Sequence, residues 1–513
     1  MATYQRPGVF IEESLQPLAD PAIGSGDYVA AFVGTSTRGG PVGPTLVSSW
    51  TQFQSLFGDI RTSPDDLHYG VWQYFANGGH LAYVVRGVNT NAVAAALTVN
   101  DTTPVTPAPT LKITATAPGL WASDATSPTR IFVTIQPSTD GGRFDLIIEA
   151  GTGGGLLARE QFVDLTLDPA DSRNAIAIVN SPTVGSKYVT LSTLAAWTAI
   201  TNNPAIATKA PLVGGTEGTG TPDLVAAAQK LAAIDSVITL NMPGVSTGAT
   251  LTDVINWAAP RTNIFVVVDG PKPLATDAAA EVTASMTTFV GSLPKTSYAA
   301  VYAPWLYLAD PASSVPGAMR LVAPGGGAVG QYALTDTSRG VHKAPAGLDT
   351  AVKGVLGVHS RFTETQLDTL NQAGVNVIRQ MVGAGFCIMG ARTLNTRMPD
   401  RYINIRRALI SLSKSLRDIT AFAIFEPNNS GLWEQIEVVV QQFLIAQMQS
   451  GLLKGSIPDN AFYVKCDGEN NPPSSQNAGI VNVEVGVALN SPAEFIIIRI
   501  GQFDGGATTE ITA

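Results

Sequence analysis

Helix-like and strand-like segments alternate regularly between residues 206 and 349. The segment LVAAAQKLAAID (224–235) has the apolar spacing of a helix, and SVITLNMP follows it as a strand. The same order repeats with TLTDVINWAAP and NIFVVVDG, and again with DAAAEVTASMTTFVGSL and SYAAVYAPWLYL. Alternation of this kind predicts parallel strands that are joined by helices packed on the sheet. We therefore expect an α/β domain over 206–349.

Two flanking segments combine helices and strands in a less regular order. Residues 28–95 read as a β-α-α-β unit, and residues 350–490 carry the longest helix patterns, at 400–420 and about 431–450. In the first of these helices the apolar residues are spaced three and four apart, which indicates one buried face. These residues are Tyr402, Ile405, Leu409, Leu412, Leu416 and Ile419. We expect 28–95 and 350–490 to form one core domain.

Between residues 96 and 205 the composition shifts to Thr, Pro and Gly, with short alternating segments that read as strands. We expect a β-rich insertion there. The predicted fold class is therefore α/β, or more broadly α+β and multidomain. Its core is built from the N- and C-terminal parts, and the β-rich domain (96–205) and the α/β domain (206–349) are inserted between them.

The two ends of the chain, 1–27 and 491–513, read as extended arms. Prolines and glycines oppose a helix in the first arm, and the second ends in a Gly/Thr-rich stretch. Each arm contains one short apolar segment of strand length, and an isolated strand is not stable in water. We expect these segments to pair with another subunit: Val9, Phe10 and Ile11 in the first arm, and Phe495, Ile496, Ile497 and Ile498 in the second.

The chain is apolar and poor in charge, with 45% hydrophobic and 14% charged residues. Soluble domains carry roughly 25% charged residues. No apolar run approaches the roughly 18 residues that a membrane span needs, so we expect no direct membrane insertion. Charge is depleted where protein faces protein, and an extensive protein interface explains the composition. The alternative is a weakly charged monomer.

The net charge is −9 and the isoelectric point is about 5.0. A nucleic-acid-binding domain is usually basic, so we expect no nucleic-acid partner. The N-terminal sequence MATYQRPGVFIEE has no basic region followed by an apolar stretch, and we expect it not to be a secretory signal. The small number of cysteines, two, fits folding and assembly in a reducing host cytoplasm.

Cysteine and histidine residues give little sign of a disulfide framework or a metal site. The two cysteines, Cys387 and Cys466, permit at most one bridge, and nothing requires it. The chain contains no HExxH sequence and no paired CxxC sequence. We expect structural roles for the four scattered histidines, which are His68, His80, His342 and His359.

The segment 244–248 matches GxSxG, the motif of a hydrolase nucleophile elbow, and it lies between a predicted strand and a predicted helix. Asp269 and His342 follow Ser246 in an order that suits a catalytic triad. The chain has 50 glycines, however, and short motifs often match by chance. A turn leading into a helix capped by Thr250 explains the same residues. We favour the turn and expect no catalytic residue; a serine hydrolase using Ser246 is the alternative function.

A second glycine motif, GGGAVG at 325–330, matches GxGxxG. Dinucleotide binding needs a strand before this motif, a helix after it and an acidic residue about 20 residues later. Here Pro324 directly precedes the glycines, and Asp349 lies in what reads as a loop. We therefore expect no nucleotide and no other cofactor.

A one-signed basic face lies opposite the apolar stripe of the 400–420 helix. At about 100° per residue, its members share an arc of roughly 100°. A solvated surface is the usual interpretation, and a docking face for an acidic partner is the functional one. In an acidic, charge-poor chain we favour docking by Arg406, Arg407, Lys414 and Arg417.

Read in order, many segments resemble signatures of the contractile tail-sheath family. One departure is FCIM at 386–389, where the family often has Trp. The similar segments span the chain: YQRPGVFIEE (4–13), AAFVGTSTRGGPVGPTLVSSWTQFQSLFG (30–58), YFANGGHLAYVVRG (74–87), APGLWAS (117–123), AAVYAPWLYLADP (299–311), TDTSRGVHKAPAG (335–347), NVIRQMVGAGFCIMGARTL (376–394), RYINIRRAL (401–409), FEPNNSGLWEQI (425–436), AFYVKCD (461–467) and PAEFIIIRIGQ (492–502).

This resemblance implies a structural, non-enzymatic subunit of a phage tail or a phage-like injection particle. Such subunits stack as rings into a helical homopolymer around an inner tail tube protein, and their arms add strands to neighbouring subunits. The baseplate and a tail terminator are further implied partners. Contraction of the polymer then drives the tube through a target cell envelope. In such a polymer we expect the basic helix face to point toward the inner tube and to hold it by charge complementarity. Another self-assembling shell or an adhesin is a third possibility.

Overall fold

The computed structural model describes residues 28–494, with gaps at 37–39, 41, 62–64, 128, 140, 153–154, 182–183, 396 and 398–400. The predicted arm strands at 9–11 and 495–498 lie outside the described residues. The chain divides into two compact units. Within the described residues the larger unit comprises 28–410 and 490–494, and the smaller comprises 411–489.

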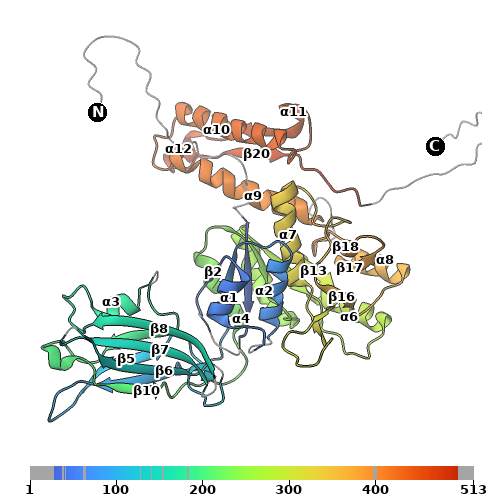
Figure 1. Ribbon diagram of the computed structural model, residues 1–513. Helices are drawn as coiled ribbons and strands as arrows, with labels where there is room; N and C mark the ends of the chain where they lie inside the picture. Colours follow the sequence, from blue (N-terminus) through green and yellow to red (C-terminus); the bar gives the residue numbers. More distant parts are fainter. Residues whose placement is uncertain are drawn as a thin grey trace, which may run out of the picture. The chain divides into compact units, whose positions relative to one another are not determined.

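An eight-stranded sheet is the centre of the larger unit, with the strand order β18-β17-β13-β12-β11-β1-β3-β2 (Figure 1). The six inner strands are parallel, and the outermost strand on each side is antiparallel to its neighbour. The strands are β1 (Tyr28–Gly34), β2 (Thr45–Val47), β3 (Ala82–Arg86), β11 (Val237–Asn241), β12 (Ile264–Asp269), β13 (Ala299–Ala303), β17 (Val375–Met381) and β18 (Gly385–Ile388).

Helices cover both faces of this sheet, which explains why its inner strands are almost wholly apolar. Alternate residues of β1 show the two faces: Val33 joins the core under one set of helices, whereas Phe32 packs on Tyr74 of α2. The first set is α4 (Leu224–Gln229), α5 (Gly248–Ala258), α6 (Ala279–Ser292) and α8 (Glu364–Ala373), and the opposite face carries α2 (Asp66–Ala76) and α7 (Gly325–Arg339).

The sheet joins segments that we expected to form separate domains. Strand β1, from the predicted core segment, pairs with β3 on one side and with β11, from the predicted α/β insertion, on the other. The ranges 28–95 and 206–349 therefore belong to one α/β domain, because the strand that follows the β-rich segment adds directly to β1. Residues 411–489 of the predicted core belong to the smaller unit.

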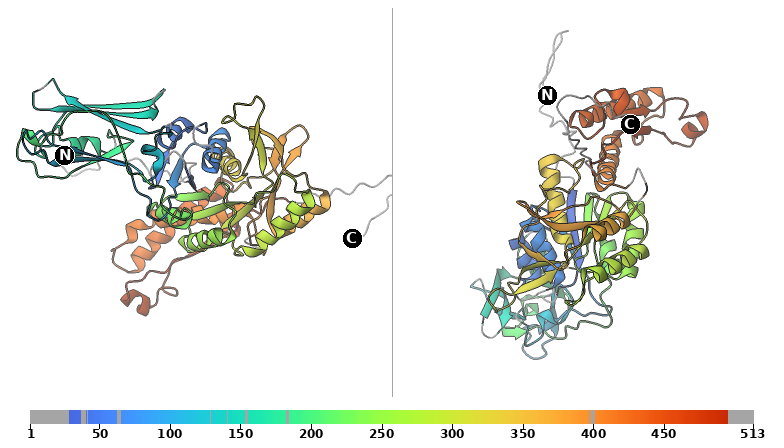
Figure 2. Two further views of the ribbon diagram at one scale, coloured as in Figure 1. Left: turned by 90° about the horizontal axis from the view of Figure 1, so that it is seen from below. Right: turned by 90° about the vertical axis from the view of Figure 1, so that its right-hand side faces the viewer.

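The β-rich segment forms two antiparallel sheets with their own hydrophobic core, drawn in cyan to green in Figure 2. One sheet has the order β4-β5-β9 and the other β10-β6-β7-β8. The strands are β4 (Ala96–Asn100), β5 (Pro109–Ala115), β6 (Ile131–Pro137), β7 (Phe144–Thr152), β8 (Gly155–Leu165), β9 (Val189–Thr193) and β10 (Ala207–Pro211), with the short helix α3 (Ala175–Val179).

The segment SYAAVYAPWLYL, expected to be one strand, is two. β13 ends at Ala303, and after Pro304 the chain continues as β14 (Leu306–Ala309) in a separate sheet with β15 (Met319–Val322) and β16 (Val355–Val358). Proline provides no backbone N–H for a sheet ladder, so the strand changes sheets there.

The short helix α1 (Trp50–Phe57) begins after Ser49, whose side chain accepts a hydrogen bond from the Gln52 amide.

The smaller unit is mainly helical, with one two-stranded sheet. Its long helix α10 (Ser430–Gln449) is capped at the N-terminus by Asn429, whose side chain accepts a hydrogen bond from the Leu432 amide. Strand β19 (Phe462–Lys465) pairs antiparallel with β20 (Glu484–Val487). The remaining helices are α11 (Pro458–Ala461) and α12 (Pro473–Asn477), and α9 (Ile403–Ile419) spans the end of the larger unit and the start of the smaller one.

Candidate functional site

The GxGxxG sequence forms the first turns of α7 and is a packing surface. A Cβ at Gly326 would lie 2.3 Å from the carbonyl oxygen of Gly70 on α2, and a Cβ at Gly330 would lie 2.8 Å from that of Tyr74. The glycines therefore allow α7 to lie directly against α2. A phosphate-binding loop instead leaves its backbone N–H groups open to a ligand, whereas the Gly325 N–H donates to Asp269.

The GxSxG sequence forms the turn between β11 and α5. Gly244 has a φ of +74°, and its amide donates to Asp269 at 3.2 Å. The helix begins at Gly248, so Thr250 is not its cap as we expected. Ser246 is half-buried in this turn.

Asp269 does not complete a triad with His342. Its carboxylate accepts hydrogen bonds from the Gly325 amide at 2.6 Å, from the Gly244 amide and from Asn241. None of these partners within the described residues is a histidine. Burial raises the pKa of Asp269 to about 7, although the hydrogen bonds from the backbone N–H groups lower it in part. The residue therefore joins the end of β12 to the start of α7, to the end of β11 and to the turn that follows β11.

Arg407, predicted to lie on the basic docking face, is buried instead, with 1% of its side chain exposed. Its guanidinium group lies between the rings of Tyr28 and Tyr332, 4.5 and 4.6 Å from their centres. It also forms a two-pronged ion pair with Asp336 of α7, at 2.9 and 2.5 Å. The Tyr28 hydroxyl donates to the Arg407 carbonyl oxygen. Arg407 therefore fixes α9 to α7 and to the start of β1.

The other three basic residues of α9 are in different environments. Arg406 is half-buried, with its guanidinium group 4.7 Å from the ring centre of Tyr298. Lys414 is half-buried and pairs with Asp418 one turn later at 2.5 Å. The continuous four-residue face that we expected is thus reduced: Arg417 is exposed, whereas Lys414 keeps 18% of its side chain exposed beside Asp418.

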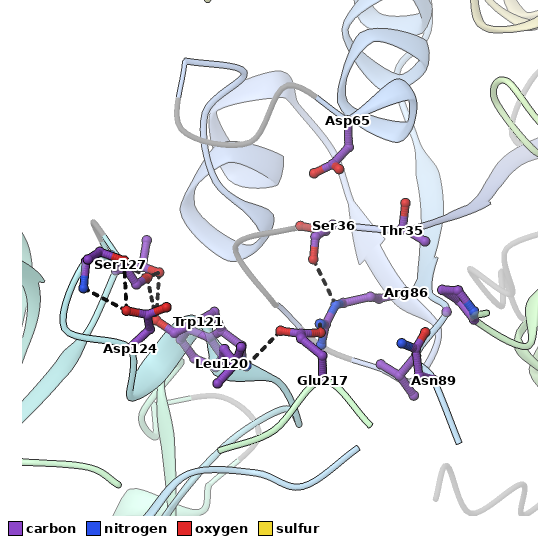
Figure 3. A pocket seen from close by; sticks show the side chains of 15 residues that line it. Thr35, Ser36, Asp65, Arg86, Asn89, Leu120, Trp121, Asp124, Ser127 and Glu217 are labelled. Carbon is purple, nitrogen blue, oxygen red and sulfur yellow. Dashed lines mark hydrogen bonds and ion pairs between the residues drawn. The ribbon is translucent and has the colours of Figure 1, made fainter. Parts of the chain in front are cut away.

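A pocket of about 570 Å³ lies where the β-rich segment leaves the sheet (Figure 3). Arg86 at its base is 3% exposed and donates to the carbonyl oxygens of Ser36, at 3.2 Å, and Pro118, at 2.8 Å. Glu217 accepts from the Leu120 amide at 2.7 Å and lies 4.0 Å from Arg86. These contacts hold the turn of the APGLWAS segment against β3. Sequence reasoning singled out that turn but missed Arg86.

Neither a metal site nor a membrane-spanning helix is found among the described residues. In the part of the chain that the structure describes, no group of three or more His, Cys, Asp or Glu side chains is arranged to hold a metal ion. No helix in that same part is long and apolar enough to cross a membrane. Cys387 and Cys466 are both buried free thiols.

Within the described residues, neither β19 nor β20 of the smaller unit pairs with another named strand, although Leu489, just after β20, forms an isolated β-bridge with Leu453. The Tyr463 ring, 55% exposed, lies over Gly486 on the opposite strand, and its hydroxyl donates to Glu484 at 2.8 Å. A two-stranded sheet is marginal by itself, and a free edge is a template for a strand from another chain.

Comparison with protein families gives one match. Residues 217–394 match the family described as the phage tail sheath protein central domain. This range begins after the β-rich segment and ends beyond β18, so it contains most of the eight-stranded sheet. No curated protein matches the chain.

Comparison with solved structures gives matches along nearly the whole chain. The sheath complex of the PVC extracellular contractile injection system, in its contracted state, has 22% identity and a TM-score of 0.55, over 98% of this chain and 99% of the other. A chain of the anti-feeding prophage baseplate has 19% identity and a TM-score of 0.55, over 98% and 99%. The sheath tail protein of Listeria innocua has 14% identity and a TM-score of 0.57, over 86% and 89%. The protein therefore has the same fold as these chains.

Proposed function

Since residues 217–394 match the phage tail sheath central domain family and the chain has the fold of contractile sheath proteins, we propose that the protein is a structural subunit of a contractile sheath. The subunit polymerises around an inner tube and contracts to drive that tube through a target cell envelope. The observation that carries this proposal is the match with sheath chains over 98% of the sequence.

The partners follow from the same proposal. The solved relatives come from a sheath complex and a baseplate, which supports self-assembly and association with a baseplate. The inner tube protein and the tail terminator are the further partners implied by the sheath resemblance. The assembled particle is a phage tail or an injection particle that forms in the host cytoplasm.

Strand exchange through the arms is the proposed basis of polymerisation. The sequence has two arms with one strand-length apolar segment each, and in the described part of the smaller unit neither β19 nor β20 has a second named strand beside it. We assign the edges of these two strands as the acceptors for arm strands from neighbouring subunits. Main-chain hydrogen bonds then supply affinity, and alternate side chains fix the register.

Deletion of residues 1–20 is expected to give a folded subunit that does not form tubes. Within the described residues, the central sheet and the two hydrophobic cores of the larger unit lie outside this segment, so the larger unit should still fold, whereas one of the two inter-subunit strands is lost. Circular dichroism, sedimentation and negative-stain electron microscopy measure the two properties separately. Tubes of normal length from the deletion variant would exclude arm exchange, and an absence of tubes from the full-length chain would contradict the sheath assignment.

We propose that Lys414 and Arg417, the two cations toward the end of α9, contact the inner tube. Reversing Lys414 and Arg417 to Glu should weaken co-assembly with the tube protein roughly tenfold at low salt, because each exposed pair contributes only about 0–1 kcal/mol and salt screens it. Sheath self-assembly should be unchanged. Lys209→Glu is the matched control, since it reverses an exposed cation that faces Glu149 in the β-rich segment. Equal tube binding by both variants would show that the face is only solvated.

An enzymatic role has no support beyond the short motif. The Asp269 carboxylate is occupied by amide donors and does not contact His342 within the described residues. The matched family is one of structural proteins. We therefore propose a non-enzymatic function, and Ser246 is a turn residue between β11 and α5.

A further inference from the structure

The short segment 490–494, here called the exit strap, is the last part of the chain that the structure describes. It follows β20 and precedes the C-terminal arm strand predicted at 495–498. Asn490, Ser491 and Ala493 are exposed, and Pro492 is half-buried. The strap therefore buries almost no apolar surface, and polar contacts must hold it in place.

Two sets of hydrogen bonds fix the strap at its ends. The Asn404 side chain donates to the carbonyl oxygen of Asn490 at 3.1 Å. At the other end the Glu494 carboxylate accepts two parallel hydrogen bonds from Arg392, at 2.8 and 2.9 Å. It also accepts from Asn371 at 3.1 Å and from the Tyr402 hydroxyl at 3.0 Å. One side chain thus contacts three residues from different parts of the fold.

The surface that receives Glu494 is itself held in place. Arg392 is 8% exposed, and its main chain exchanges two hydrogen bonds with the buried Asn376 side chain, at 2.7 and 2.8 Å. Its guanidinium group also donates to the Asn371 carbonyl oxygen at 2.8 Å. The backbones of Arg392 and Tyr402 form a β-bridge. Donors positioned in this way bind a carboxylate without first having to be ordered.

The surroundings favour the ionised carboxylate. Burial raises the pKa of Glu494, but the hydrogen bonds from Arg392 and Asn371 oppose it, so that the pKa is lowered overall. The strap lines a pocket of about 520 Å³ whose other walls, among the residues described, contain no carboxylate and four basic side chains. These are Arg339, His342, Lys343 and Arg379.

We propose that Glu494 is the anchor of the C-terminal arm, the residue that positions the arm for pairing with a neighbouring subunit. This inference rests on the proposed sheath function. Without the anchor, the Asn404 contact with Asn490 would still hold the start of the strap, and the free segment would gain residues 491–494, which adds roughly 14 Å of contour length. The anchored strap is ordered before the arm pairs, so pairing does not have to order it, and a shorter free linker raises the effective concentration of the arm strand.

Two substitutions remove the anchor from opposite sides. Glu494→Ala removes the carboxylate, and Arg392→Met removes the guanidinium group that receives it. Each should accelerate amide hydrogen exchange in 490–494 about tenfold, and raise the critical concentration for tube formation by about the same factor. The double variant should be no worse than either single one, because both break the same interaction.

Two further variants separate anchoring from folding and from charge alone. Glu494→Gln keeps the length and the acceptor oxygen, and should restore most of the tube formation lost in Glu494→Ala. Glu364→Ala removes a 90% exposed carboxylate, also paired with an arginine, Arg379, and should change neither readout. Unchanged exchange in 490–494 would overturn the anchor, as would faster exchange with an unchanged critical concentration. Failure of the unaltered chain to form tubes would instead contradict the sheath function, and the exchange measurement would still test the anchor.

Discussion

Arg407→Met is expected to destabilise the larger unit by about 3–5 kcal/mol, because it leaves the buried carboxylate of Asp336 without its counter-ion. Asp336 is only 6% exposed, and both of its oxygens are bound by the Arg407 guanidinium group. The substitution also removes the cation between the rings of Tyr28 and Tyr332. Chemical denaturation followed by circular dichroism measures the loss.

The matched control is the neighbouring arginine on the same helix. Arg406 is half-buried and stacks on one ring, Tyr298, so Arg406→Met should cost about 1 kcal/mol or less. In a second control, Asp336→Leu combined with Arg407→Met removes both charges, and should recover part of the stability that the single variant loses. Equal stability of Arg406→Met and Arg407→Met would mean that Arg407 is not buried in the folded subunit.

The burial of Arg407 also shows that helical periodicity predicts a helix but not the environment of each of its faces. The spacing of apolar residues predicted the helix at 400–420, and α9 covers 403–419. The same periodicity put Arg407 on a face away from the stripe, but it carries no information about what covers that face. The partner, Asp336, lies 71 residues earlier in the chain and has no local pattern that connects it to Arg407.

The mixed α/β class and the order of most elements were predictable because strand and helix patterns are local. The grouping of strands was not. β1 and β11 are separated by the whole β-rich segment, yet they are neighbours in one parallel sheet. A domain boundary read from a composition shift marks where a segment is inserted, but it does not show whether the chain returns to the same sheet afterwards.

Helix α7 was missed for a physical reason. Gly325, Gly326, Gly327 and Gly330 fall in its first turns, and each glycine costs about 1 kcal/mol relative to alanine in a helix. Local propensity therefore argues against a helix here. Contact with α2 overrides it, since only a residue without a side chain fits between the two backbones. The motif that resembled a nucleotide-binding signature is thus the mark of close helix packing.

This explanation predicts opposite effects of glycine-to-alanine substitution in two helices. Gly326→Ala should destabilise the larger unit by about 3 kcal/mol, because overpacking displaces backbone that has nowhere to move. The new Cβ would lie 2.3 Å from the Gly70 carbonyl oxygen and 2.6 Å from the Gly70 Cα. Helix α2 cannot retreat without losing the packing of Tyr74 on Phe32 in the central sheet.

Gly291→Ala is the matched control, because Gly291 lies inside α6, is exposed, and has no heavy atom within 4 Å of its added Cβ among the residues described. It should stabilise the subunit by about 0.5–1 kcal/mol through helix propensity. Hydrogen exchange of the α2 and α7 amides locates the effect: Gly326→Ala should loosen these two helices first, and Gly291→Ala should leave them unchanged. If both substitutions stabilise the protein, α7 does not lie against α2 as closely as the glycines require.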